Sequence, residues 1–160
     1  MRSLSDTSRA HAAGGTQKAD ARPALRAVRV TQRYRVTPSR VFDAWVDPDT
    51  AARWLFATAS HPAARVSIDA RAGGSFSFVE RRGRGEIEYA GEYLELSPPR
   101  RLVFVLSEPA NGRTRVSVEI VPVRSGSEVT VVHEPLPAEQ AGLVEGRWSG
   151  MLYGLGTLLR

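Results

Sequence analysis

Three polar side chains occupy strand positions that face the same way as apolar neighbours. They are Gln32, Glu80 and His133, each in register with apolar residues two positions away. A buried polar group without a partner costs roughly 1–3 kcal/mol, so each must contact a ligand, water or another polar group. His133 and Glu80 can also carry a proton, and His133 titrates closest to neutral pH. We take these two as the candidate catalytic residues; the alternative is that all three bond to water or neighbouring backbone.

Other catalytic and metal-binding patterns are absent from the sequence. It contains no G-x-S-x-G, H-E-x-x-H, P-loop or G-x-G-x-x-G motif. There is no cysteine, and the three histidines, His11, His61 and His133, lie far apart along the chain. We therefore expect no metal site and no cofactor.

The composition argues against a nucleic-acid or membrane partner. The net charge is +5, but the basic residues alternate with carboxylates, and only the segment from Glu80 to Glu86 is densely charged. A nucleic-acid-binding protein more often gathers its basic residues into one stripe with aromatic residues among them. No apolar run approaches the roughly 20 residues of a membrane span. The lack of cysteine favours a reducing compartment, so we expect a cytoplasmic protein.

The first 24 residues differ from the rest of the chain. Apart from Met1, Leu4 is their only large apolar side chain, too little to form a core. We predict a disordered tail over residues 1–24 and one domain over residues 25–160.

Alternating apolar residues predict seven strands, beginning with one that contains Val28. The next stretch, "TPSRVFDAWVDPDTAARWLFA", predicts two short helices capped by Thr37 and Asp47, each followed by a proline at the first helical position. Six further strand segments are joined by hairpin-length spacers such as "SPPR" and "RSGS". Consecutive strands should therefore be antiparallel neighbours. We expect Pro135 and Pro137 to end the sheet, and Gly91 to mark a β-bulge.

The last segment, "EQAGLVEGRWSGMLYGLGTLLR", has the spacing of an amphipathic helix. Its apolar stripe runs through Val144, Trp148, Met151, Leu155 and Leu158. The opposite face carries glycines at positions 142, 146, 150 and 154, each costing roughly 1 kcal/mol relative to alanine. Two interpretations stay open: close approach of another backbone, or low local stability in a helix that must move.

These elements predict an α+β fold, in which a curved seven-stranded antiparallel sheet wraps around the long C-terminal helix and two short helices follow the first strand. Aromatic residues on the inner face then predict an apolar cavity between the sheet and the helix. The predicted ligand-binding residues are Gln32, Trp54, Phe76, Phe78, Tyr89, Phe104, His133, Trp148, Met151 and Leu152.

The chain resembles the SRPBCC (START-like, birch-allergen-like) superfamily, in the branch similar to the activator of heat-shock-protein-90 ATPase. The matching segments are "VFDAWVDPDTAARWL", "AGGSFSF", "YAGEYLELSPPRRLVF", "EVTVVHEPLP" and "EGRWSGMLYGLGTLL". The last is similar to a closing Gly-Trp…Leu…Leu signature, carried by Gly146, Trp148, Leu152 and Leu155, except that Arg147 separates the glycine from the tryptophan. The resemblance implies a helix-grip fold over about residues 25–160.

Fold alone does not decide among the functions of this superfamily. We favour non-catalytic binding of a small hydrophobic or aromatic molecule by a monomer or homodimer. One alternative is a co-chaperone role with a chaperone partner. A further alternative is a polyketide cyclase-like enzyme that uses His133 and Glu80.

Overall fold

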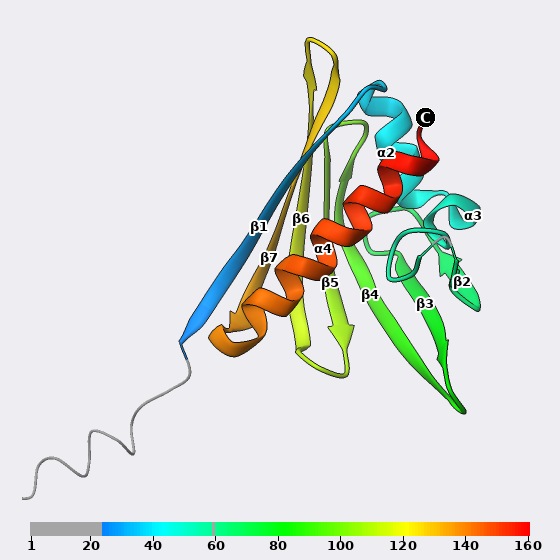
Figure 1. The fold of residues 1–160 in the computed structure, drawn as a ribbon, viewed down its shortest axis with the longest axis vertical. Helices are drawn as coiled ribbons and strands as arrows, with labels where there is room; N and C mark the ends of the chain where they lie inside the picture. Colours follow the sequence, from blue (N-terminus) through cyan, green and yellow to red (C-terminus); the bar gives the residue numbers. More distant parts are fainter. Residues whose placement is uncertain (1–23, 59) are drawn as a thin grey trace, which may run out of the picture.

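Hairpins connect six of the seven strands as sequential neighbours, and the first strand joins the last. The computed structural model describes residues 24–58 and 60–160, so the predicted tail lies outside the described residues except for Ala24. The sheet is antiparallel throughout, in the order β1-β7-β6-β5-β4-β3-β2 (Figure 1). The elements are β1 (Leu25–Tyr34), α2 (Pro38–Val46), α3 (Pro48–Ala51), β2 (Arg65–Ile68), β3 (Ser75–Arg82), β4 (Gly85–Ser97), β5 (Arg101–Glu108), β6 (Gly112–Val123), β7 (Gly126–Pro137) and α4 (Ala138–Leu158).

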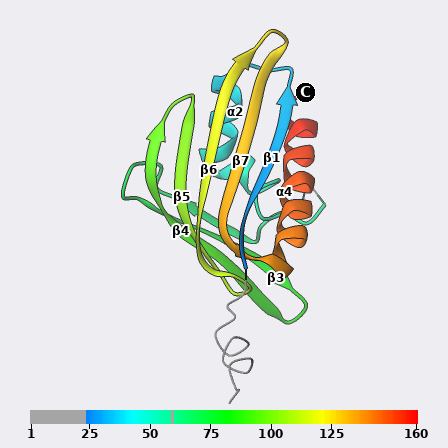
Figure 2. The same cartoon turned by 90° about the vertical axis from the view of Figure 1, so that its left-hand side faces the viewer.

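The sheet curves around α4, as Figure 2 shows from the side. The helix lies closest to β1 and β7, at one end of the strand order. Strand β2 is at the other end, next to β3 and β4, and the segment after α3 approaches α4 on that side (Figure 1). The predicted α+β helix-grip architecture is confirmed. None of the helices in the described part of the chain is long and apolar enough to cross a membrane.

The two short helices begin where the sequence predicts. The Thr37 hydroxyl accepts a hydrogen bond from the backbone N–H of Arg40, and the Asp47 carboxylate accepts one from that of Thr50 at 2.9 Å. These caps satisfy backbone donors at the helix N-termini. The hydrogen bonds from Thr50 also lower the pKa of Asp47. The second helix is shorter than expected, because α3 ends at Ala51 and Trp54 lies beyond it.

Two expectations about the sheet need correction. Strand β7 ends at Pro137, as expected, but Pro135 lies within it. Beyond Glu134 the strand pairs only with β1, so Pro135 interrupts no ladder with β6. The irregularity in β4 lies between Tyr93 and Glu95 rather than at Gly91. A Cβ at Gly91 would collide with the carbonyl oxygen of Val105 and the ring of Phe76, so glycine permits a close approach there.

The predicted stripe of α4 is the face that enters the core. Trp148, Leu152 and Leu155 are fully buried, and Val144 and Met151 nearly so. In the sheet, alternate residues of β6 and β7 are buried, as the alternation of their sequences predicts. β5, apolar on both faces, is the central strand.

Candidate functional site

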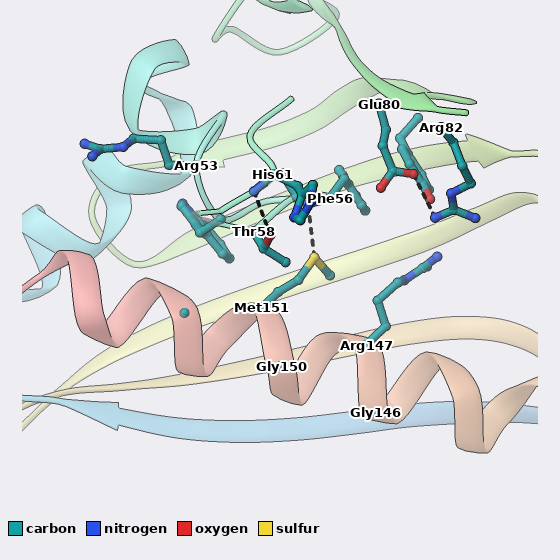
Figure 3. A pocket seen from close by; sticks show the side chains of 14 residues that line it. Arg53, Phe56, Thr58, His61, Glu80, Arg82, Gly146, Arg147, Gly150 and Met151 are labelled. Carbon is teal, nitrogen blue, oxygen red and sulfur yellow. Dashed lines mark hydrogen bonds and ion pairs between the residues drawn. The ribbon is translucent and has the colours of Figure 1, made fainter. Parts of the chain in front are cut away.

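A groove of about 520 Å³ opens along one side of α4 (Figure 3). We call it the α4 groove. The helix contributes Gly146, Arg147, Gly150, Met151 and Gly154. The segment after α3 contributes Arg53, Trp54, Phe56, Ala57, Thr58 and His61. Strands β3 and β4 contribute Glu80, Arg82 and Tyr89.

Phe56 forms the aromatic wall of the groove together with Tyr89. Their rings are stacked, with centroids 4.8 Å apart and planes 5° from parallel. The Phe56 backbone has a φ of 54°, a left-handed conformation that costs an L-residue with a bulky side chain about 1–2 kcal/mol. Its N–H donates to the Met151 thioether 3.0 Å away, which attaches this segment to α4. Strained backbone of this kind is concentrated at ligand sites in proteins.

The Tyr89 hydroxyl is a neutral polar group at the groove. Burial, and secondly the negative charge of Glu80, raises the pKa of the Tyr89 phenol. At physiological pH it is therefore available as both hydrogen-bond donor and acceptor.

The glycines of α4 form the floor of the groove. Among the described residues, no atom lies within 4 Å of a Cβ added at Gly146, Gly150 or Gly154, and the same holds at Gly142, which lies outside the groove. The interpretation that another backbone approaches the glycine face is therefore wrong for the part of the chain that the structure describes. Instead, the helix backbone borders an open space at these glycines. Larger residues at the same positions would place their side chains in that space.

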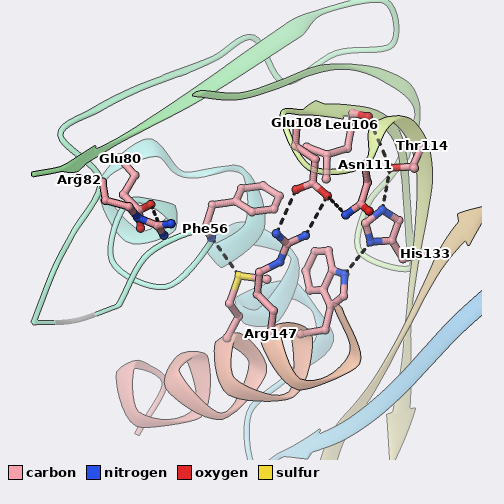
Figure 4. A network of polar contacts seen from close by, with 11 residues as sticks. Phe56, Glu80, Arg82, Leu106, Glu108, Asn111, Thr114, His133 and Arg147 are labelled. Carbon is pink, nitrogen blue, oxygen red and sulfur yellow. Dashed lines mark hydrogen bonds and ion pairs between the residues drawn. The ribbon is translucent and has the colours of Figure 1, made fainter. Parts of the chain in front are cut away.

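Two ion pairs occupy one end of the groove. Arg82 pairs with Glu80 at 2.8 Å. Arg147 pairs with Glu108 at 3.0 Å (Figure 4). The Arg147 guanidinium lies 5.7 Å from the centre of the Tyr89 ring. The Glu108 side chain is only 1% exposed, so it needs this cation.

Arg147 is the residue that interrupts the Gly-Trp pattern of the sequence signature. The structure explains why an arginine stands at this position. The buried carboxylate of Glu108 on β5 is paired with Arg147 and accepts a hydrogen bond from the Asn111 amide at 2.7 Å. In the sequence, the only sign at this position is that Arg147 separates the glycine from the tryptophan of the signature, and this does not identify Glu108 as its partner.

His133 belongs to the core and does not line the α4 groove. The Trp148 indole N–H donates to His133 Nδ1 at 3.0 Å. The other ring nitrogen, Nε2, must then carry the proton and donate to the Thr114 hydroxyl at 2.7 Å. Both nitrogens are satisfied (Figure 4). Burial lowers the pKa of His133 to about 4, so the imidazole is neutral at physiological pH.

The aromatic rings fill the space in which the sequence predicts a cavity. Phe76, Phe78 and Phe104 are nearly or fully buried, with Phe76 and Phe104 edge-on at 5.2 Å. The void among these rings measures about 10 Å³, too small for any ligand. Trp148 and Leu152 are fully buried in the same core.

Gln32 lies away from the other predicted residues. It is half-buried in a separate groove between the end of β1 and the C-terminal part of α4, and its side-chain amide donates to the Arg33 carbonyl at 3.4 Å. Of the predicted ligand-binding residues, the structure thus brings together Trp54, Tyr89 and Met151 at the α4 groove, with Glu80 beside them.

A sequence profile described as Activator of Hsp90 ATPase homolog 1-like protein matches residues 35–160. The chain belongs to this family. The match confirms the predicted superfamily and its activator branch. No curated protein matches the chain significantly in sequence.

Solved structures from several bacteria share the fold of this family member. Protein CV1439 from Chromobacterium violaceum has a TM-score of 0.69 and 24% identity, over 82% of this chain and 96% of that one. Protein NE0264 from Nitrosomonas europaea has a TM-score of 0.70 and 22% identity, over 83% and 93%. The AHSA1-like protein from Aeromonas hydrophila has a TM-score of 0.71 and 22% identity, over 82% and 90%.

Sequence reasoning missed several residues of the groove. Phe56 follows a short helix in a segment without periodicity, and its left-handed backbone leaves no mark in the sequence. Arg53 and Arg82 look like ordinary surface residues. The four-residue glycine spacing was the available signal, and it pointed to an unusual helix face without saying what lies against it.

Proposed function

We propose that the α4 groove binds a small apolar or aromatic molecule without using the protein's side chains for catalysis. The observation that carries this proposal is the groove itself: about 520 Å³, with the stacked Phe56 and Tyr89 rings as its wall and glycine backbone as its floor. Grooves of 300–1,000 Å³ lined by aromatic residues with a few polar groups are typical small-molecule sites.

The state of the two candidate acid–base residues supports binding over catalysis. His133 is buried, neutral and hydrogen-bonded on both nitrogens, so it has neither access to the groove nor a free nitrogen. Glu80 lines the groove, but its carboxylate is paired with Arg82. A general base needs a lone pair directed at the proton it removes.

The two glycine variants Gly150→Ala and Gly142→Ala test the location of the site. Both add one methyl group to the same helix in open space, but only Gly150 lines the groove. With N-phenyl-1-naphthylamine as a neutral fluorescent probe, Gly150→Ala should weaken binding about tenfold, because the methyl group occupies ligand space. Gly142→Ala should bind the probe like the parent protein.

Two results would refute the proposal. One is that the probe fails to bind the parent protein. The other is that it binds Gly150→Ala as tightly as Gly142→Ala. A change in folding cannot mimic the expected result, since both substitutions should affect helix stability alike.

The family description supplies a second candidate, an interaction with an Hsp90-type chaperone that raises its ATPase rate. It is tested by adding the purified protein to the chaperone from the same cell. Co-purification with a raised ATPase rate would support it, and an unchanged rate without co-purification would exclude it.

A further inference from the structure

We infer that the molecule bound in the α4 groove is an organic anion, whose acidic group contacts Arg53 and whose apolar body lies over the glycine floor. The inference rests on the proposed function and specifies the ligand class. It follows from an unequal distribution of charge between the two ends of the groove, which Figure 3 shows with Arg53 at one end and Arg82 and Arg147 at the other.

The Arg82 end is electrostatically balanced by the protein itself. Arg82 is paired with Glu80 at 2.8 Å, and Arg147 with the buried Glu108 at 3.0 Å. Two cations thus face two carboxylates. An anion placed here would have to compete with a carboxylate already in contact, so this end favours an uncharged part of the ligand.

The Arg53 end has a cation without a counter-charge. Arg53 is exposed and forms no ion pair within the described residues. Among the described residues that line the groove, Glu80 is the one carboxylate, and it lies at the opposite end. The lining also includes Thr58 and His61, whose Oγ1 and Nδ1 atoms lie 3.3 and 3.2 Å from the Ser60 hydroxyl. The exposed guanidinium of Arg53 suits a carboxylate, sulfonate or phosphate.

The floor between the two ends has room for an extended apolar body. From Gly146 to Gly154 the helix axis advances about 12 Å, at 1.5 Å per residue. Along this length the groove presents glycine backbone on one side and Met151 and Phe56 near the middle. This length accommodates a ligand of two or three rings against the aromatic wall formed by Phe56 and Tyr89.

Two fluorescent probes that differ by one charged group test the inference. They are 1-anilinonaphthalene-8-sulfonate and its uncharged counterpart N-phenyl-1-naphthylamine, each titrated into the parent protein, Arg53→Gln and Arg124→Gln. Arg124 is an exposed arginine in the β6–β7 turn outside the groove, so its variant controls for the loss of net charge. Arg53→Gln should weaken the sulfonate probe about three- to fivefold, the range of an exposed ion pair, and should weaken the neutral probe less.

The control variant should bind both probes like the parent. Added NaCl should weaken the sulfonate probe in the parent more than in Arg53→Gln. Equal effects of Arg53→Gln on both probes, or no effect on either, would overturn the inference while the proposed function stands. The inference would also be overturned if Gly150→Ala bound the sulfonate probe as tightly as the parent protein, because the anion would then lie outside the groove. Failure of the neutral probe to bind the parent would refute the proposed function itself.

Discussion

The two faces of α4 differ in what surrounds them. On one face Trp148, Leu152 and Leu155 are fully buried, and the Trp148 indole N–H is bonded to His133. On the other face, a Cβ added at Gly146 or Gly150 would have no atom of the described residues within 4 Å. The buried face therefore accounts for the stability of the helix in the fold, and the glycine face contributes only space. The residues that hold the helix in the fold and the glycines of the proposed binding groove thus lie on opposite sides of one helix.

Polar groups follow the same division. His133, Thr114 and Trp148 satisfy one another inside the core, where an unmet group would be costly. Arg53 stays exposed at the groove without an ion-pair partner in the described chain. A polar residue among apolar ones is thus not evidence of a site by itself. What matters is whether its hydrogen bonds are already made.

Removal of Trp148 should have the largest effect on stability. Trp148→Ala leaves a cavity in the core and deprives His133 Nδ1 of its donor. We expect a loss of about 3–5 kcal/mol in the free energy of unfolding, measured by urea titration with circular dichroism. Tyr153→Ala is the matched control, since Tyr153 is on the same helix but 69% exposed. Comparable losses in the two variants would contradict the distinction between the faces.

Arg147→Ala should have the second-largest effect on stability. We expect a loss of about 3 kcal/mol in the free energy of unfolding, because the substitution leaves the Glu108 carboxylate buried without its cation. The double variant Arg147→Met with Glu108→Leu removes both charges and should recover most of the stability. Chemical unfolding of the two variants in parallel measures this. If the double variant is no more stable than Arg147→Ala, the charge of Glu108 is not the cause.

The pH dependence of stability reports on His133. Burial depresses its pKa in the folded protein to about 4, below the unfolded value of 6.5, so the unfolded state binds the extra proton first. Its contribution to stability is complete above pH 6.5 and is lost as the pH falls toward 4. We expect His133 to account for a loss of about 2 kcal/mol between pH 7 and pH 5.

The His133→Gln variant isolates this contribution, since glutamine does not titrate and the carboxylates are unchanged. Unfolding free energies at a series of pH values should fall less steeply for the variant than for the parent protein. Parallel curves would show that His133 is not buried in its neutral form.

Gly142→Ala and Gly150→Ala should have the smallest effect on folding, and in the opposite direction. Each should raise the free energy of unfolding by about 0.5–1 kcal/mol, because alanine restricts the unfolded chain and meets no obstacle in the helix. Thermal unfolding of both variants checks this. A destabilised Gly150→Ala protein would mean that the glycine face is packed.

Local patterns in the sequence were sufficient to predict the architecture of the fold. Alternation in β6 and β7 identifies the inner face, Thr37 and Asp47 identify helix starts, and the spacing around Trp148 identifies the buried side of α4. Each of these rests on near neighbours in the chain, whose relative positions are fixed once the element forms.

The site was harder to predict because it depends on volumes and distant contacts. Alternation places Phe76 and Phe104 on the inner face, but it does not tell whether their rings leave a cavity or fill it. It places His133 inside, but not against Trp148 and Thr114. The groove depends on the position of Phe56, which is held by Met151 from a helix almost a hundred residues later in the chain.

The pairing of β1 with β7 has a consequence for the order of assembly. Val28 lies opposite His133, so β1 has no neighbour in the described sheet until β7, the last of its strands along the chain, has been made. Hairpins from β2 to β7 can form between adjacent segments as they emerge, while β1 must wait and then close the longest loop in the molecule. Since α4 begins directly after β7 and rests on β1, this late closure and the docking of the helix belong to the same final step.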